Sequence, residues 1–282
     1  MNEIIAAFER DLTLRALSKR TIKTYSAKLK GFFAYYRNAT DCVTAENVKN
    51  YLYHLLKEKG LSNETVRQCA GAIKFYCRYT GNIPCALDSV PQLKQAKRLP
   101  EVLNLEEVAR LLRCAANVKH RTMLTLAYAS GLRVSEIPAL KPSDIKRDSL
   151  KLLVRHAKGN KDRYTVLSRD CLSLLESYWR AYHPKDWLFP GRQAGPISVR
   201  ACQHAFEIAK TGAGISKPGG IHMLRHSFAT HSLEAGTGIF QLQKMMGHAN
   251  LKTTLVYVHI TEEKVRVESP FDAFRAQFTE ER

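Results

Sequence analysis

The sequence predicts a mainly α-helical chain with one small β-hairpin, divided into two domains. A length of 282 residues is more than one domain usually needs. Apolar residues recur at spacings of three and four along most of the chain, as in amphipathic helices. The period changes to two only within residues 149–167. We therefore expect a helical domain over residues 1–83, a linker over 84–100 that contains three prolines, and a second domain over 101–282.

The charge of the chain favours a polyanionic partner. Hydrophobic residues make up 45% and charged residues 25%, which is ordinary for a globular protein. Lys and Arg total 44 against 26 Asp and Glu, so the net charge is +18. Each phosphate that such a surface neutralises releases condensed counterions. Nucleic acid is the first candidate for the partner, and an anionic membrane surface is the second.

Membrane insertion and structural cysteine chemistry are not expected. No run of the sequence approaches the roughly 20 apolar residues that span a bilayer. The first twelve residues include an acidic residue near the N-terminus and lack the basic n-region of a signal peptide. The seven cysteines form no CxxC pair, which favours free thiols over a zinc site or a disulfide framework. We expect a cytoplasmic protein.

Four helices account for the first domain. The first covers about 2–16. Ser18, Thr44 and Ser62 are N-cap candidates for the next three, since each precedes an apolar run with helical period. The fourth helix should stop before Gly81.

Basic side chains occupy one face of the second and fourth of these helices. Such a face is commonly just solvated. Here hydroxyl and amide side chains lie beside the cations, a mixture that suits phosphate positioning with some base reading, so we favour DNA contact. A basic linker between two basic domains suggests a clamp around a duplex. The cations expected to contact DNA are Lys19, Arg20, Lys23, Lys28, Arg67 and Lys74 of the helices, Lys97 and Arg98 of the linker, and Lys161 and Arg163 of the hairpin.

The second domain should open with two helices. Asn104 and Glu107 form the pattern of a capping box before a helix over 105–116. An apolar helix over 120–130 then ends at Gly131. In the segment that follows, Arg133 and Glu136 lie three apart on a short helix that Pro138 must strain. On spacing alone, Arg133 would be a surface cation after a glycine turn.

Residues 149–167 read as a β-hairpin. Apolar residues alternate up to a turn at Lys158-Gly159-Asn160 and alternate back at Tyr164 and Val166, which places Lys158 and Lys161 at the tip. Ser168 then caps a helix over 169–182, with Leu172, Leu175 and Trp179 expected to point inward. Further helices are expected over 198–210, 224–235 and 238–246, and a last one from near Asn250.

His222, Arg225 and His226 share one face if their segment is helical. The two histidines have the spacing of a zincin helix, but Met223 stands where that motif needs Glu, and an arginine beside a metal ion is unfavourable. A structural role suits His226. Phosphate chemistry suits the other two, because Arg225 offers a planar fork to oxygens and His222 can exchange a proton.

Tyr257 decides between these interpretations. A lone tyrosine on a C-terminal helix is usually a core residue. A tyrosine that accompanies arginines, a lysine and histidines can instead be a nucleophile, since cations stabilise its anion and a base accepts its proton.

Five segments in order resemble the tyrosine recombinases, also called phage-integrase-type site-specific recombinases. These are ASGLRVSEI around Arg133, AKGNKDR around Lys158, HMLRHSFATH from His222, MMGHANLKTT around His248 and TTLVYVH around Tyr257. Residues 1–83 resemble the family's core-binding, SAM-like domain. The resemblance implies that this domain and a mixed α/β catalytic domain form a C-shaped clamp on DNA.

The resemblance also implies the role of each matching residue. Arg133 and Arg225 would hold the scissile phosphate and neutralise its developing charge. Lys158 would protonate the leaving 5′ oxygen.

The remaining three matches would act at the nucleophile. His222 would assist proton transfer at Tyr257, and His248 would hydrogen-bond the phosphate. Tyr257 would form a 3′-phosphotyrosine link, with no metal, cofactor or ATP required. His226, His231 and His259 are left with structural roles.

The family implies a double-stranded DNA site as partner and a tetramer on two sites, formed by this chain alone or with a paired recombinase. Integration, excision or resolution would pass through a Holliday junction, in the bacterial or archaeal cytoplasm at the nucleoid. A Xer-like resolvase and a mobile-element integrase fit equally well. The apolar residues of the tail after Tyr257 would dock on a neighbouring protomer or cover their own core. Alternatives are a type IB topoisomerase, a DNA-binding regulator without catalysis and a metal-dependent nuclease.

Overall fold

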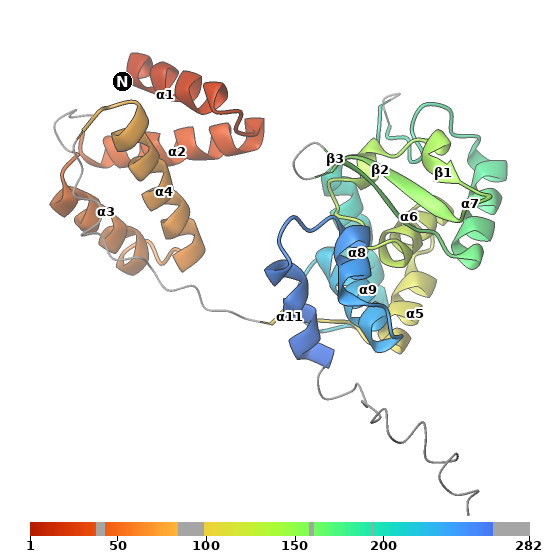
Figure 1. The fold of residues 1–282 in the computed structure, drawn as a ribbon. Helices are drawn as coiled ribbons and strands as arrows, with labels where there is room; N and C mark the ends of the chain where they lie inside the picture. The colour runs from red at the N-terminus through yellow and green to blue at the C-terminus, as the bar shows by residue number, and fades with distance from the viewer. Residues whose placement is uncertain (38–42, 84–98, 158–160, 193–194, 262–282) are drawn as a thin grey trace, which may run out of the picture. The chain divides into compact units, whose positions relative to one another are not determined.

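The structure is a computed structural model that describes residues 1–37, 43–83, 99–157, 161–192 and 195–261. The chain divides into two compact units, Met1–Lys97 and Arg98–Arg282. The described residues are mainly helical, with one three-stranded sheet that belongs to the second unit (Figure 1). The predicted fold class, a helical N-terminal domain followed by a mixed α/β domain, is confirmed. No helix within these ranges is long and apolar enough to cross a bilayer.

The first unit is built from four helices, coloured red to orange in Figure 1. They are α1 (Asn2–Leu14), α2 (Lys19–Tyr35), α3 (Ala45–Lys57) and α4 (Asn63–Tyr79). The three predicted caps are confirmed, because the side chains of Ser18, Thr44 and Ser62 each accept a hydrogen bond from the backbone N–H three residues on. The apolar stripes meet in one core, whose fully buried members include Phe8, Leu12, Leu29, Phe32, Phe33, Val66 and Ile73.

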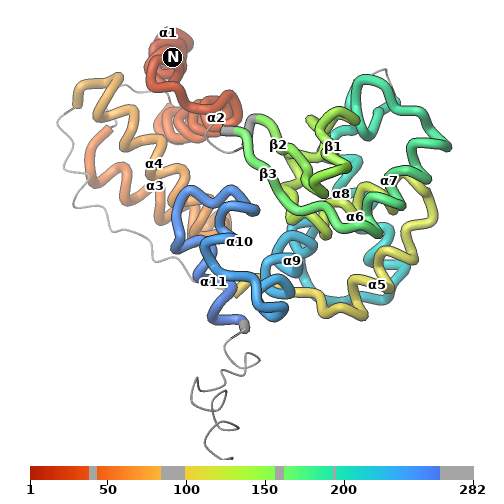
Figure 2. Tube along the Cα trace, turned by 45° about the vertical axis from the view of Figure 1, so that its right-hand side comes forward, coloured from red at the N-terminus to blue at the C-terminus, as the bar shows by residue number. Residues whose placement is uncertain are grey.

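The second unit combines its sheet with seven helices among the described residues. The helices are α5 (Leu105–Cys114), α6 (Val118–Ala129), α7 (Arg169–Tyr182), α8 (Val199–Gly212), α9 (His222–Glu234), α10 (Ile239–Met246) and α11 (Lys252–Thr261). Two short 3₁₀ turns, η2 (Ile137–Ala139) and η3 (Pro142–Asp144), follow α6. Figure 2 shows α9, α10 and α11 as consecutive parts of this unit in blue.

Local signals set most helix starts. The capping box is present as predicted: Asn104 Oδ1 accepts from the Glu107 N–H at 2.8 Å, and the Glu107 carboxylate accepts from the Asn104 N–H at 2.8 Å. Helix α6 starts earlier than predicted, because the Asn117 side chain accepts from the His120 N–H and caps it there. Pro138 shortens the next segment to a 3₁₀ turn, as expected from its missing N–H.

The sheet is antiparallel with the order β1 (Ile145–Lys146), β2 (Lys151–Ala157) and β3 (Lys161–Val166). The hairpin β2–β3 is the predicted one, whereas the two residues of β1 are too few to show a period. Leu152 pairs with Thr165 and Val154 pairs with Arg163. Cross-strand partners share a face, so Thr165 and Arg163 point to the buried side. Tyr164 and Val166 therefore lie on the exposed side.

Helix α7 corrects one core expectation. Trp179 was expected to point inward, but 50% of it is exposed. Its neighbour Tyr178 is fully buried instead, and the Tyr178 hydroxyl donates to the carbonyl of Leu188 at 3.0 Å. The inward face of α7 is centred on Leu175 and Tyr178, which are one helical turn apart.

Candidate active site

Helix α9 lies at the centre of the second unit and carries two of the predicted catalytic residues. Its side chains are buried on several faces, because Met223, Leu224 and Phe228 pack against other helices. Arg225 is only 4% exposed, whereas His222 stands exposed at the first position of the helix. The helix thus presents a buried guanidinium and an accessible imidazole one turn apart.

Arg225 donates to two backbone carbonyls from distant parts of the chain. Its Nη1 donates to Gly131 O at 2.5 Å and its Nη2 donates to Met246 O at 2.7 Å. Burial, and next the charge of Arg133, lower the pKa of Arg225 to about 9. The guanidinium therefore remains charged at neutral pH.

Arg133 converges on the same place from the turn after α6. Its Nη1 donates to Glu136 Oε1 at 2.9 Å, and its Nη2 donates to Gly247 O at 2.9 Å. The side chain keeps 19% of its surface exposed. Two arginines that are far apart in sequence therefore both donate to carbonyls at the C-terminal end of α10. The exposed part of Arg133 leaves this side chain accessible to a phosphate.

The turn that positions Arg133 requires glycine at position 131. Its φ is +60°, and a Cβ built there would lie 2.3 Å from the ring of Phe228. Only glycine has both the backbone freedom and the small size that this approach between α6 and α9 requires. The Gly131 carbonyl in turn accepts from Arg225, so the turn links both arginines.

Arg163 departs from the DNA-contact role expected for it. Its side chain is 8% exposed. Its Nη1 and Nη2 donate to Glu136 Oε1 and Oε2 at 2.7 and 2.8 Å, and its Nε donates to Met245 O at 2.8 Å. All three nitrogens of this guanidinium therefore have partners within the protein. Strand register causes the change, because Arg163 pairs with the buried Val154.

Glu136 is the acidic centre of this cluster. Burial alone would raise the pKa of Glu136, but hydrogen bonds and charge from Arg163, then from Arg133, hold it below its usual range. The carboxylate is thus ionised at neutral pH. One negative charge faces three arginines, which leaves the cluster with an excess of positive charge.

His248 follows the end of α10, where Gly247 turns the chain with φ +62°. The Nε2 of His248 lies 3.0 Å from Arg225 Nη2, and its Nδ1 lies 2.9 Å from Thr254 Oγ1. Burial, then the charges of Arg225, Arg133 and Arg163, lower the pKa of His248 to about 3. The imidazole is therefore neutral and accepts a hydrogen bond from Arg225.

Tyr257 of α11 reaches the same cluster. The residue is 4% exposed, and its ring stacks on His248 with an interplanar angle of 10°. Its Oη lies 2.8 Å from Nδ1 of His226, the histidine that sequence reasoning assigned to a structural role. Burial, then the charges of His222 and Arg225, lower the pKa of His226 to about 4, so its ring is neutral. In the tautomer with its proton on Nε2, Nδ1 accepts from the phenol.

Burial also raises the pKa of Tyr257, and the charges of Arg225 and Arg133 act in the opposite direction. His222 has its pKa lowered by the surrounding protein first and by Arg225 and Arg133 next. The site therefore combines a protonated phenol with neutral imidazoles and charged guanidinium groups. This is the state from which a hydroxyl nucleophile can pass its proton to a base.

The remaining predicted residues are distributed as follows. Lys158, Lys97 and Arg98 lie outside the described residues, and Lys161 begins β3 without a described side chain. The predicted DNA-contact cations of the first unit lie on α2 and α4. Lys28 is half-buried and the others are exposed; these are Lys19, Arg20, Lys23, Arg67 and Lys74. His231 hydrogen-bonds Tyr128 at 2.9 Å. Within the described ranges, no group of three His, Cys, Asp or Glu side chains could hold a metal ion.

Residues 101–264 match the phage integrase family, and residues 4–85 match the phage integrase N-terminal SAM-like domain. The chain belongs to the phage integrase family. Within this family it is similar to tyrosine recombinases, which are enzymes that cut and rejoin DNA. One is tyrosine recombinase XerD of Halalkalibacterium halodurans, 33% identical over 89% of this chain and 91% of the relative. Another is tyrosine recombinase XerA of Pyrococcus horikoshii, 32% identical over 94% of this chain and 92% of the relative.

Solved structures agree on the fold. The XerH site-specific recombinase bound to a palindromic difH substrate aligns with a TM-score of 0.75 and 22% identity, over 91% of this chain and 80% of that one. The family assignment drawn from the five sequence motifs is confirmed. The motifs did not reveal the contacts of His226 and Arg163. For Arg163, the pairing of the hairpin strands was the one available signal.

Proposed function

We propose that this chain is a site-specific recombinase that cuts and rejoins double-stranded DNA through Tyr257. The observation that carries the proposal is a chain of contacts: the ring of Tyr257 stacks on His248, and His248 accepts from the buried Arg225. A phenol, two guanidinium groups and neutral imidazoles from four separate segments meet there. These are the groups that phosphoryl transfer to a hydroxyl needs.

In the first step, Tyr257 Oη attacks the scissile phosphorus. A bond forms between Oη and phosphorus, and the bond to the 5′ oxygen breaks. The 5′ oxygen takes a proton from Lys158, which we retain as the general acid. The resulting 3′-phosphotyrosine is a phosphodiester, so rejoining to the 5′ hydroxyl of a second strand needs no ATP. Two such exchanges pass through a Holliday junction.

Arg133 and Arg225 hold the two non-bridging oxygens of the phosphate in this scheme. In the described conformation, both guanidinium groups donate to carbonyls instead. A bound phosphate would offer charged acceptors to their remaining N–H groups, and charge-assisted hydrogen bonds are the stronger kind. Loss of one such donor typically lowers the rate about 100- to 1,000-fold.

His226 is the residue best placed to accept the hydroxyl proton of Tyr257. Its neutral ring and the 2.8 Å distance support a role as first proton acceptor in the described conformation. His222 is exposed at the start of α9, where it can pass a proton to solvent or DNA. His248 is placed to contact the phosphate beside Arg225.

For the whole molecule, we propose residues 1–83 as the core-binding domain, 84–100 as a basic linker and 101–282 as the catalytic domain with its tail. Both domains would contact a specific DNA site, with the exposed cations of α2 and α4 on the DNA side. A tetramer on two sites is the proposed working form. Support comes from a lambda integrase tetramer bound to a Holliday junction, which shares the fold. We propose a cytoplasmic, nucleoid-associated protein of a mobile element or a Xer-like system.

The test is covalent capture. Binding sites are first selected by footprinting on random genomic fragments, and a nicked suicide version of the selected site is then incubated with the protein. We expect a protein–DNA adduct on a denaturing gel with the wild type and none with Tyr257→Phe, which retains the ring and its stacking. A wild type that binds the site without forming an adduct would refute the proposal, as would an adduct formed by the Phe variant.

A further inference from the structure

We propose that Arg163 is a positioning residue that holds Glu136 and the end of α10, and thereby fixes the guanidinium of Arg133. This inference rests on the proposed function, because its effect is measured on strand cleavage. Sequence reasoning placed Arg163 among the DNA contacts. Its surroundings in the fold argue for an internal role.

The contact with Glu136 is a two-pronged one that a lysine cannot reproduce. Both terminal nitrogens of Arg163 donate to the two carboxylate oxygens, at 2.7 and 2.8 Å. Glu136 Oε1 also accepts from Arg133 Nη1, and Glu136 Oε2 also accepts from the Arg133 backbone N–H. A shift of the carboxylate therefore moves Arg133 directly.

The second contact is with the last turn of α10. Three successive carbonyls there, those of Met245, Met246 and Gly247, accept from Arg163, Arg225 and Arg133 respectively. Carbonyls in the last turn of a helix lack partners within the helix and carry partial negative charge. Arg163 thus contributes the third member of a set whose other two members are the proposed phosphate ligands.

The packing around Gly247 is independent evidence that the fold holds the Arg163 side chain in place. A Cβ at position 247 would lie 2.7 Å from Arg163 Cδ and 3.1 Å from its Nε. The stem of Arg163 therefore packs directly on the glycine backbone. Gly247 immediately precedes His248, so the same packing also fixes the backbone position from which the imidazole of His248 extends.

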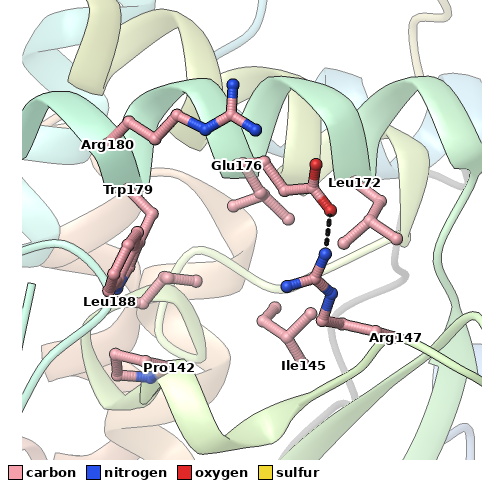
Figure 3. Close-up of a pocket in the computed structure, with 9 residues that line it drawn as sticks. Pro142, Ile145, Arg147, Leu172, Glu176, Trp179, Arg180 and Leu188 are labelled. Atoms are coloured by element: carbon pink, nitrogen blue, oxygen red, sulfur yellow. Dashed lines mark hydrogen bonds and ion pairs between the residues drawn. The ribbon is translucent and has the colours of Figure 1, made fainter. Parts of the chain in front are cut away.

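A surface pair in the same unit provides a matched control. Arg147 and Glu176 form an ion pair beside a pocket lined by Pro142 and Trp179 (Figure 3). Their side chains are 67% and 32% exposed, whereas those of Arg163 and Glu136 are 8% and 6% exposed. Exposed pairs contribute little, so replacing Arg147 tests the loss of an arginine fork without disturbing the cluster.

The experiment compares Arg163→Lys with Arg147→Lys, after the wild type has been shown to form the covalent adduct. Single-turnover cleavage of the suicide site and DNA affinity at several salt concentrations are measured for each. For Arg163→Lys we expect cleavage to fall about 100-fold, as misplacement by about 1 Å does, with unchanged affinity and salt dependence. Arg147→Lys should match the wild type in both measurements.

Two outcomes overturn the proposal. In one, cleavage by Arg163→Lys equals that of the wild type. In the other, weaker binding accounts for the loss, with a salt slope or affinity altered as expected of a phosphate contact. The double variant Glu136→Gln/Arg163→Lys tests whether Arg163 acts through Glu136. If it does, Arg163→Lys lowers cleavage little further when Glu136→Gln is already present. Losses that multiply would contradict that route.

Folding is checked by thermal unfolding. If Arg163→Lys does not fold, Gly247→Ala takes its place, because it displaces the aliphatic part of Arg163 and keeps the charge. It should likewise lower the cleavage rate and leave the DNA affinity unchanged. Unchanged cleavage by a folded Gly247→Ala would then overturn the proposal. Failure of the wild type to form an adduct would instead refute the proposed function, so the two failures are distinguishable.

Discussion

The hydroxyl of Tyr257 lies 2.8 Å from Nδ1 of His226. His226 is the next residue after Arg225, so one helix, α9, holds both the hydrogen-bond partner of Tyr257 and a proposed phosphate ligand. The distance between the proposed nucleophile and the proposed phosphate site is therefore set largely by how α11 packs on α9. That packing places Tyr257 in a small cluster with Phe228 and Leu242.

Replacing His226 should slow cleavage without weakening DNA binding. His226→Leu removes the acceptor, and loss of a positioned proton acceptor typically lowers a rate by about 100-fold or more. His226→Asn offers an amide oxygen near the place of Nδ1 and should recover part of the rate and alter its pH profile. Single-turnover cleavage on the suicide site measures both. His259→Asn, at an exposed position of α11, is the control. Equal rates for His226→Leu and wild type would contradict the role.

The stability of the second unit should decrease in mild acid. The pKa of His226 is lowered to about 4 and that of His248 to about 3, whereas an unfolded histidine titrates near 6.5. Below pH 6.5 the unfolded chain therefore binds more protons than the folded one. The stabilisation is complete above pH 6.5 and is lost progressively as the pH falls, down to about 4 for His226 and about 3 for His248.

Urea unfolding at pH 7 and pH 5 measures this loss. His248→Asn removes one of the two groups, so its stability should change less between the two pH values than that of the wild type. An identical change in both proteins would show that other groups dominate the pH dependence.

Gly131→Ala should destabilise the second unit more than Gly214→Ala does. Both glycines have φ near +60°, +60° and +65° respectively, so both substitutions incur the same backbone strain. A Cβ at Gly214 meets nothing within 4 Å, but a Cβ at Gly131 meets Phe228 at 2.3 Å. We expect a loss of about 1–2 kcal/mol for Gly214→Ala, the cost of a side chain in the left-handed region, and about 1–3 kcal/mol more for Gly131→Ala. Chemical denaturation compares the two, and equal losses would show that the Phe228 ring moves freely.

Cleavage should continue in EDTA. Arginine and lysine side chains neutralise the phosphate in the proposed scheme, which is the task that Mg²⁺ performs in other phosphoryl-transfer enzymes. The measurement is adduct formation with and without EDTA at constant ionic strength. Activity that disappears in EDTA and returns with Mg²⁺ would contradict the scheme.

Local sequence signals were sufficient for the helices. Ser18, Thr44 and Ser62 cap their helices through contacts within three residues, and such contacts are visible in the sequence itself. Trp179 and Arg163 show where this reasoning fails. Whether a side chain on a helix or strand is buried depends on which neighbour covers it, and that neighbour comes from elsewhere in the chain.

The same limit applies to the site. Motifs nominated Arg133, Arg225 and Tyr257, and the fold brings these three segments together. Motifs could not identify the hydrogen-bond partners, because the partner of Tyr257 is decided by the packing of α11 on α9. The sequence therefore assigned His226 a structural role, whereas in the fold it contacts Tyr257.

The packing of Arg163 on Gly247 has a consequence for exchanging parts between relatives. Glu136, Arg163 and Gly247 lie on three separate segments, and Arg163 contacts both of the other two. A chimera that imports the β2–β3 hairpin from another recombinase, without the matching residues at positions 136 and 247, would join incompatible halves of one cluster. The smallest unit that such engineering can transplant is therefore defined by this trio and not by any continuous stretch of chain.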